Sequence, residues 1–135
     1  MINEKELRIG NLLQMPFLGN VNIEVIGMAL AERNEGLKLF VQGKTKSGDT
    51  FFELPDKYKS IVLSTEFLEK TELVKDGILY QKGKFAIKKW VIGGEIEWVI
   101  FWGDKAILYE KNYPVHRLQN LYFALSNEEL QLSST

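Results

Sequence analysis

The chain contains no cysteine, a single histidine (His116) and only three prolines. Without cysteine it has no disulfides, thiolate nucleophiles or cysteine metal ligands. No apolar run exceeds five residues, whereas a membrane-spanning helix needs about 18. Residues 1–11 include acidic side chains and lack the apolar stretch of a signal peptide. We therefore expect a soluble, cytoplasmic protein that does not associate with membranes.

An excess of charge of either sign is also missing. The 17 basic and 18 acidic side chains give a formal net charge of −1, whereas a non-specific nucleic-acid binder usually carries a clear positive excess. Hydrophobic residues (45%) and charged residues (26%) are close to globular averages. A chain of 135 residues has the size of one ordinary domain, so we expect a single domain over residues 1–135.

The first half of the sequence predicts an antiparallel meander. Residues 7–13 are typical of a strand with a bend at Gly10 and Asn11, and residues 21–25 alternate between apolar and polar. Shorter strands are expected at 37–41 and 50–54, with a turn at 34–36 and a polar loop at 43–49. This spacing favours a small barrel or sandwich, and an SH3-like barrel is the specific hypothesis.

The second half predicts four further strands, at residues 78–81, 85–92, 95–102 and 106–109. Gly93 and Gly94 join the middle two, and a Gly-Gly pair between β-rich runs is typical of a two-residue hairpin. One face of this hairpin is then expected to form the core, through the pairs Val91–Ile96, Lys89–Trp98, Ile87–Ile100 and Phe85–Trp102. The opposite face would be a mixed surface, with the pairs Trp90–Glu97, Lys88–Val99 and Ala86–Phe101.

Two helices complete the prediction, which is an α+β fold of eight to ten mostly antiparallel strands. A short helix is expected near 64–73, with Ser64 as its N-cap. A longer helix is expected near 114–126, with Pro114 in its first turn. Its apolar stripe, which should lie on the sheet, consists of Val115, Leu118, Leu121, Tyr122 and Leu125. Residues 129–132 favour a last strand over a helical turn.

Three segments resemble a group of small uncharacterised proteins of Bacteroides-type gut bacteria, many of them carried by prophages and other mobile elements. The segments are LRIGNL at 7–12, LSTEFL at 63–68 and VHRLQNLYFAL at 115–125. The usual family spellings are close to LRIGNLV, PLTEEWL and YVHQLQNLYFALTGEEL. This chain has Arg117 for Gln, Phe67 for Trp, and Ser126-Asn127 for Thr-Gly. The resemblance implies provenance and fold, and it brings no catalytic or binding residues with it.

The first candidate site is one flank of the longer helix, formed by His116, Gln119, Asn120 and Phe123. These side chains could form the rim of a small polar pocket for a ligand or peptide. The more common role of buried polar side chains is to pair backbone groups of an adjoining sheet or loop. His116 has no nucleophile or orienting carboxylate at a recognisable spacing, so we expect no catalytic site. We also expect no metal and no cofactor.

The second candidate is the hairpin of residues 82–90. Lys82, Lys84, Lys88 and Lys89, with aromatic residues between them, are typical of single-strand nucleic-acid binding, and Lys44 and Lys46 could extend the patch. Alternatively, Lys88, Trp90 and Phe101 on the outer face could bind another protein, or Trp90 and Phe101 could be covered by the strands of the first half. The leading hypothesis is a non-enzymatic interaction protein of a phage-like or mobile-element locus. A nucleic-acid-binding accessory protein is the alternative, and an enzyme ranks last. The sequence does not define the oligomeric state.

Overall fold

The computed structural model describes residues 2, 4–16, 19–34 and 36–132. Two compact units divide the chain, namely Met1–Ile61 with Val115–Asn120, and Val62–Pro114 with Leu121–Thr135. Within the described residues the fold contains ten strands in two five-stranded antiparallel sheets, and two α-helices. The predicted α+β class and the number of strands are confirmed. The prediction of a single domain stays a prediction.

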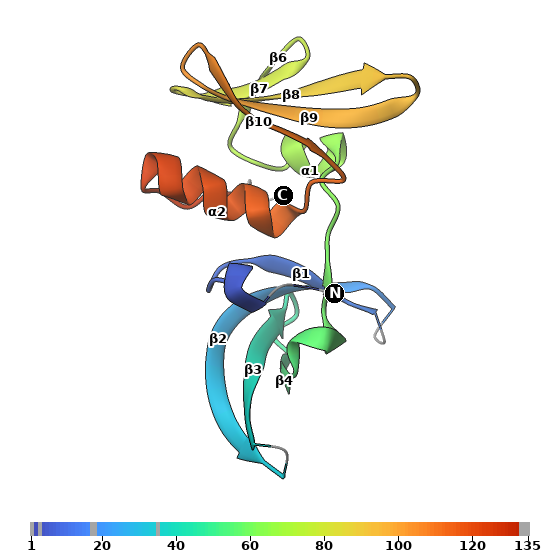
Figure 1. Ribbon diagram of the computed structural model, residues 1–135, viewed down its shortest axis with the longest axis vertical. Helices are drawn as coiled ribbons and strands as arrows, with labels where there is room; N and C mark the ends of the chain where they lie inside the picture. Colours follow the sequence, from blue (N-terminus) through green and yellow to red (C-terminus); the bar gives the residue numbers. More distant parts are fainter. Residues whose placement is uncertain (1, 3, 17–18, 35, 133–135) are drawn as a thin grey trace. The chain divides into compact units, whose positions relative to one another are not determined.

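The first unit is an antiparallel sheet with the strand order β4-β3-β2-β1-β5 (Figure 1). A one-turn 3-10 helix, η3, precedes the last strand, β5, which pairs antiparallel with β1. The more specific SH3-like barrel stays a prediction. A second 3-10 helix, η1, opens the chain. The elements are η1 (Glu4–Glu6), β1 (Leu12–Met15), β2 (Val21–Arg33), β3 (Gly36–Thr45), β4 (Thr50–Glu53), η3 (Pro55–Lys57) and β5 (Lys59–Ser60).

Three strand predictions in this unit are wrong at their ends. The strand predicted at 21–25 continues to Arg33, because it pairs with β3 up to that residue. Residues 7–11 form a tight turn instead of a strand, because Arg8 N donates to Asn11 Oδ1 at 2.7 Å and Gly10 has a φ of 99°. The strand β3 runs on to Thr45, through residues predicted as a polar loop, because it pairs with β2 on one side and β4 on the other. Tertiary pairing therefore overrides the weak strand propensity of this stretch.

The second unit is a five-stranded meander with the order β10-β9-β8-β7-β6. Gly93 and Gly94 both have positive φ, at 59° and 82°, as a tight two-residue hairpin requires. The cross-strand pairs between β8 and β9 are those predicted from this turn. The strands are β6 (Val74–Asp76), β7 (Leu79–Lys82), β8 (Phe85–Ile92), β9 (Glu95–Trp102) and β10 (Lys105–Lys111).

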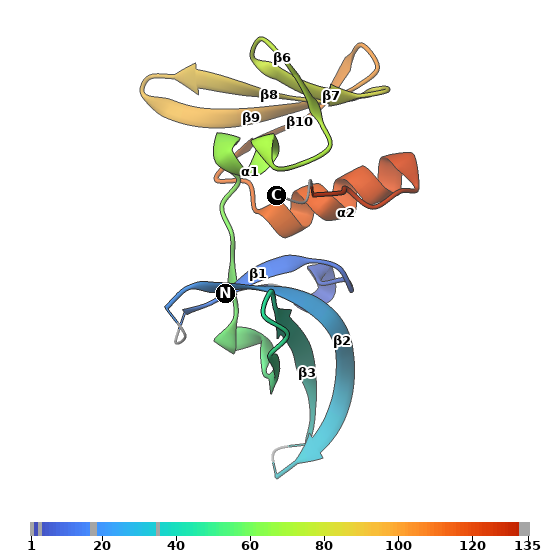
Figure 2. The same ribbon diagram turned by 180° about the vertical axis from the view of Figure 1, so that it is seen from behind.

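One face of this second sheet, the inner face, is covered by helices. The helix α1 (Thr65–Glu69) and residues 121–126 of α2 (Val115–Ser126) lie on it (Figures 1 and 2). The rings of Phe85 and Tyr122 meet edge to face at 5.0 Å. Four of the predicted core residues on this face are buried, namely Phe85, Ile87, Trp98 and Ile100. At the hairpin tip the prediction of a buried core is wrong, since Val91 and Ile96 are exposed.

The helix ends follow local capping chemistry. Ser64 is the N-cap of α1 as predicted, and its hydroxyl accepts from Phe67 N, but the helix ends at Glu69 instead of near residue 73. Pro114 is the N-cap of α2 and not its first helical residue. Asn127 ends α2 with a φ of 60°, a left-handed conformation common at this position. No helix in the described part of the chain has the length and apolar character needed to cross a membrane.

The segment after α2 is extended but barely paired. The predicted strand at 129–132 is reduced to an isolated bridge between Leu132 and Thr71, next to a hydrogen bond from Glu72 N to Gln131 O at 2.9 Å. The side chain of Ser126 bonds back to Tyr122 O and accepts from Glu128 N. Ser126 therefore closes α2 and does not begin a new helical turn.

Candidate functional site

The polar flank of α2 is engaged within the first unit. Gln119 accepts a hydrogen bond from Leu12 N at 2.9 Å and donates to Gly10 O at 3.1 Å. Asn120 Oδ1 accepts from Asn11 Nδ2 at 2.8 Å and from Arg8 Nε at 3.1 Å. Both amides thus pair with polar groups of residues 8–12, which is the common structural role of buried polar side chains. Phe123, the fourth predicted residue of this flank, falls in the second unit.

His116 is buried in the first unit beside Glu6. Its Nε2 lies 3.5 Å from Glu6 Oε2, and neither ring nitrogen makes a hydrogen bond to a described residue. Burial lowers the pKa of His116 below its ordinary value, and the Glu6 carboxylate opposes this only in part. The native state therefore favours a neutral imidazole.

The outer face of the second sheet lies opposite the inner face that the helices cover. We call four of its residues the aromatic face, namely Lys88, Trp90, Phe101 and Tyr109. Lys88 and Tyr109 are the direct cross-strand neighbours of Val99, on β8 and β10 respectively. Trp90 lies diagonally across from Val99 on β8, and Phe101 lies two residues further along β9 on the same face. Val99 is fully buried, although a mixed, hydrated surface was predicted here. These long side chains therefore form a small apolar layer on the outer side of the sheet.

Within the aromatic face, the ammonium group of Lys88 lies over the exposed ring of Trp90. Lys88 Nζ lies 4.9 Å from the centroid of the Trp90 ring, within cation–π range. The Trp90 and Tyr109 rings lie 6.4 Å apart and are tilted by 49°. Trp90 remains 39% exposed and Tyr109 56% exposed. The arrangement places two partly exposed aromatic rings and an ammonium group on one face of the sheet.

Tyr109 joins this face because of a β-bulge. The register between β9 and β10 shifts between Ala106 and Leu108, which pair with Phe101 and Ile100. Without the extra residue, Tyr109 would stand opposite Trp98 and point toward the covered face. An added residue reverses every later side chain of a strand. Sequence reasoning missed Tyr109 for this reason, and no local signal for the bulge is present.

One end of the aromatic face is bordered by paired charges. Lys111 Nζ forms an ion pair with Glu95 and lies 3.9 Å from Glu97 Oε1. The hydrogen bond from Lys111 Nζ to the Glu95 carboxylate raises the pKa of Lys111 and lowers the pKa of Glu95. Lys111 is held by these carboxylates, so Lys88 is the cation that lies beside the rings.

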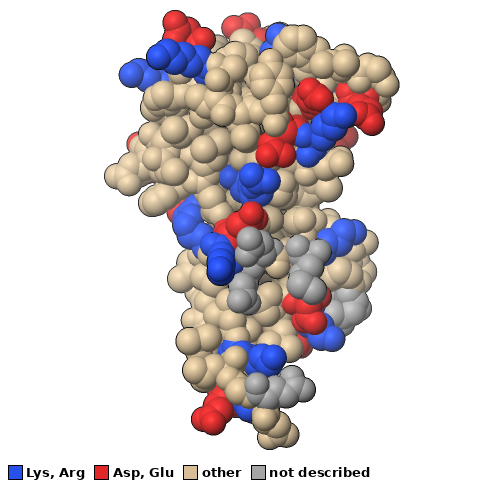
Figure 3. Space-filling model, viewed as in Figure 1, with Lys and Arg blue, Asp and Glu red and all other residues tan. Residues whose placement is uncertain are grey.

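The four lysines predicted to contact nucleic acid do not come together. Lys82 pairs with Glu72 at 3.1 Å and with Glu128 at 3.8 Å. Lys82 and Lys89 stand opposite Phe85 and Trp98, on the inner face, whereas Lys88 lies on the outer one and Lys84 in the turn between β7 and β8. Basic and acidic side chains are interspersed over the face of the molecule in Figure 3. Lys44 and Lys46 belong to the first unit.

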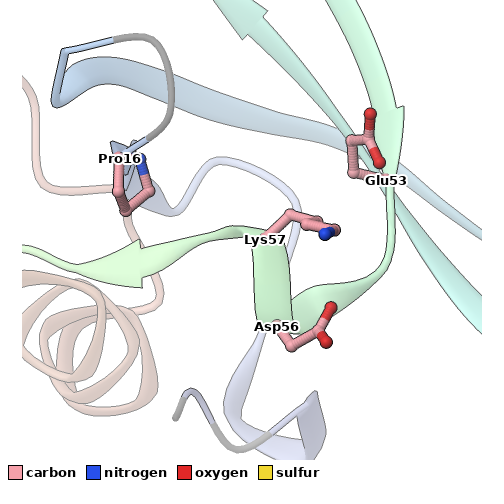
Figure 4. A pocket seen from close by; sticks show the side chains of 4 residues that line it. All are labelled: Pro16, Glu53, Asp56 and Lys57. Carbon is pink, nitrogen blue, oxygen red and sulfur yellow. The ribbon is translucent and has the colours of Figure 1, made fainter.

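A shallow pocket in the first unit was not predicted. It has a volume of about 510 Å³ and is lined by Pro16, Glu53, Asp56 and Lys57, which come from the end of β1, the end of β4 and η3 (Figure 4). Burial and the nearby Glu53 carboxylate raise the pKa of Tyr58 to about 12, and its hydroxyl donates to Val41 O at 2.7 Å. No group of three or more His, Asp or Glu side chains suited to a metal occurs among the described residues.

The aromatic face is a better-defined candidate than the shallow pocket, because its rings and its lysine contact one another.

No family model, curated protein or solved structure matches this chain. The resemblance to the Bacteroides-type proteins accordingly stays a prediction from the three sequence motifs.

Proposed function

We propose that this protein is a non-enzymatic binding protein of a phage-like or mobile-element locus, and that the aromatic face holds another protein. The observation that carries the proposal is the exposed Trp90–Tyr109 pair with Lys88 over the indole. The association with mobile elements rests on the three sequence motifs alone.

The chemistry of the aromatic face supports a protein partner. Trp and Tyr supply a large contact area with few rotatable bonds, and both are enriched at the energetic centres of interfaces. Lys88 adds one positive charge beside the rings, while Lys111 is neutralised by its carboxylate neighbours. A matching partner offers an apolar or aromatic side chain next to a carboxylate. The amides of Gln119 and Asn120 are used within the first unit, which makes the α2 flank the weaker candidate.

The test is affinity capture from a lysate of the native host with purified bait. The bait proteins are the wild type, a Trp90→Ala/Tyr109→Ala variant and a Phe52→Ala control. Phe52 is a comparably exposed aromatic residue (47%) that stacks on Phe40 in the other unit. We expect a partner protein that survives nuclease treatment, is captured by the wild type and by Phe52→Ala, and is lost with the double variant. Equal capture by all three baits would contradict the proposal.

Nucleic acid is the second candidate, because a lysine beside an exposed tryptophan also suits base stacking. It predicts that single-stranded oligonucleotides bind directly and that the affinity falls steeply with salt. Lys88→Glu should then abolish binding, while Lys82→Glu, at a lysine already held by Glu72, should change it little. Oligonucleotide binding with this pattern, together with capture that nuclease abolishes, would replace the protein-partner proposal.

A further inference from the structure

The hairpin of β2 and β3 extends beyond its neighbours in the first sheet. The strand β1 and the adjoining turn bond to β2 only over residues 21–25, and β4 pairs with β3 only over residues 41–44. We call the remainder, residues 27–33 of β2 and 36–40 of β3, the arm. Figures 1 and 2 show these two strands curving away from the rest of the first unit. Within the described residues, no third strand pairs with either edge of the arm.

The arm has an apolar face exposed to solvent. The cross-strand pairs Leu30–Leu39 and Glu32–Leu37 place the leucines on the same face as buried Val41. Leu30 is 67% exposed and Leu37 is 68% exposed. Two strands alone are at best marginally stable in water, and an exposed apolar strand edge invites pairing. The exposed edges of the arm can therefore pair with another strand.

The two edges of the arm differ in charge. Along β3 the centre of the edge is Lys38, and a lysine at such a position discourages strand addition. Along β2 the two charged residues, Glu32 and Arg33, lie at the end of the arm, and residues 27–31 read Gly-Met-Ala-Leu-Ala and carry no charge. The β2 edge is thus the one that accepts a strand.

The side-chain sizes along this edge are symmetric about Ala29, with small residues at 27 and 31 and large apolar residues at 28 and 30. An antiparallel pair related by a two-fold axis needs such a symmetric pattern, because each residue meets its mirror position in the second copy.

We propose that the occupant of the β2 edge is a second copy of this chain. The two edges pair antiparallel about Ala29, so that Met28 of each copy faces Leu30 of the other and the small residues meet on the opposite face. No charge stands opposite a like charge, and the apolar faces of both arms join into one four-stranded surface. This interface lies on the first unit and is independent of the proposed function of the aromatic face.

Sedimentation equilibrium of the purified full chain over a range of concentrations tests the proposal. We expect a monomer–dimer equilibrium. Leu30→Lys should raise the dissociation constant at least about tenfold, because it places a lysine and its copy at the paired edge. Leu37→Lys is the matched control, with the same chemistry, exposure and face but on the β3 edge, and it should leave the constant nearly unchanged. A monomer at every concentration, or equal effects of both variants, would overturn the proposal.

Site-specific crosslinking adds a test that does not depend on destabilising the arm. The natural chain has no cysteine, so a single introduced thiol reports one position. Ala29→Cys should give a covalent dimer with a short bis-maleimide reagent, because directly opposed residues have Cβ atoms about 4.5–5.5 Å apart. Lys38→Cys, which lies on the same face but on the β3 strand, should give little. Equal yields from both variants would contradict the proposed pairing, and capture of a different protein by the Ala29→Cys thiol would show another occupant.

Discussion

Asn11 and Asn120 stand 109 positions apart in the chain and join through a hydrogen bond of 2.8 Å from Asn11 Nδ2 to Asn120 Oδ1. Asn11 is fully buried in the turn before β1. Asn120 also donates to Glu6 O and accepts from Arg8 Nε. The first and last of the three sequence motifs thus meet at one amide. Their joint presence in the sequence has a structural reason, because each satisfies the polar groups of the other.

Replacing Asn120 with alanine should therefore destabilise the fold. The change leaves the Asn11 amide and the Glu6 carbonyl without their partner, and we expect a loss of roughly 2–3 kcal/mol in the free energy of unfolding. Urea denaturation followed by circular dichroism measures it. Asn22→Ala is the control, since Asn22 is exposed and should change stability by less than about 0.5 kcal/mol. Equal losses of stability in both variants would show that the hydrogen bonds of Asn120 do not stabilise the fold.

The burial of His116 predicts a pH dependence of stability. Its pKa is lowered in the folded state, so the unfolded chain binds a proton that the native chain resists. The stability from the neutral imidazole is fully present above the ordinary pKa of about 6.5 and is lost as the pH falls below it. His116 is the only histidine, so an NMR titration of its ring gives this pKa directly. A titration midpoint at or above the ordinary value would contradict the burial.

Gly43 is predicted to be intolerant of a side chain. A Cβ at this position would lie 2.8 Å from Ile23 Cδ1 and 3.4 Å from Tyr58 Cε1. Gly43→Ala should therefore cost about 1–3 kcal/mol through overpacking. Ile23→Val removes the closest atom, so the double variant should lose less than the sum of the two single changes. Additive losses in a thermal denaturation series would show that the contact with Ile23 is not the cause.

The end of α2 offers a stabilising change. Asn127 holds a left-handed φ of 60° directly after the last residue of α2. Glycine adopts this conformation without a steric penalty, so Asn127→Gly should stabilise the protein by a few tenths to about 1 kcal/mol. Asn127→Ala should destabilise it by about 1 kcal/mol, because alanine lacks asparagine's tolerance of positive φ. Melting temperatures that rank the alanine variant highest would rule out this description of the helix end.

Local patterns predicted the register of β8 and β9 because two glycines fix the turn and every later pair follows by counting. The same alternation could not show where the covering layer ends. Val91 and Ile96 continue the pattern of the buried face, but they lie at the tip and are exposed. Alternation assigns a residue to one side of a sheet, whereas its burial depends on whether another element reaches that far.

Local patterns likewise predicted some of the site residues and missed those that depend on distant parts of the chain. The sequence identified Trp90 and Phe101 as outer-face residues, because their positions relative to the turn are fixed. It missed Tyr109, which the bulge in β10 turns to that face. It gave two roles for the flank that holds Gln119, a pocket rim and the more common pairing of backbone groups. It did not identify the partner, Leu12 N, which is 107 positions away. A contact across that separation leaves no trace in a local pattern.

Titration calorimetry with the captured partner measures whether the aromatic face binds it. We expect Trp90→Ala to raise the dissociation constant about 30-fold or more above that of the wild type, as for an aromatic residue at an interface centre. The Phe52→Ala control should bind like the wild type. Unchanged affinity with Trp90→Ala, or an equal loss with Phe52→Ala, would contradict the assignment of binding to this face.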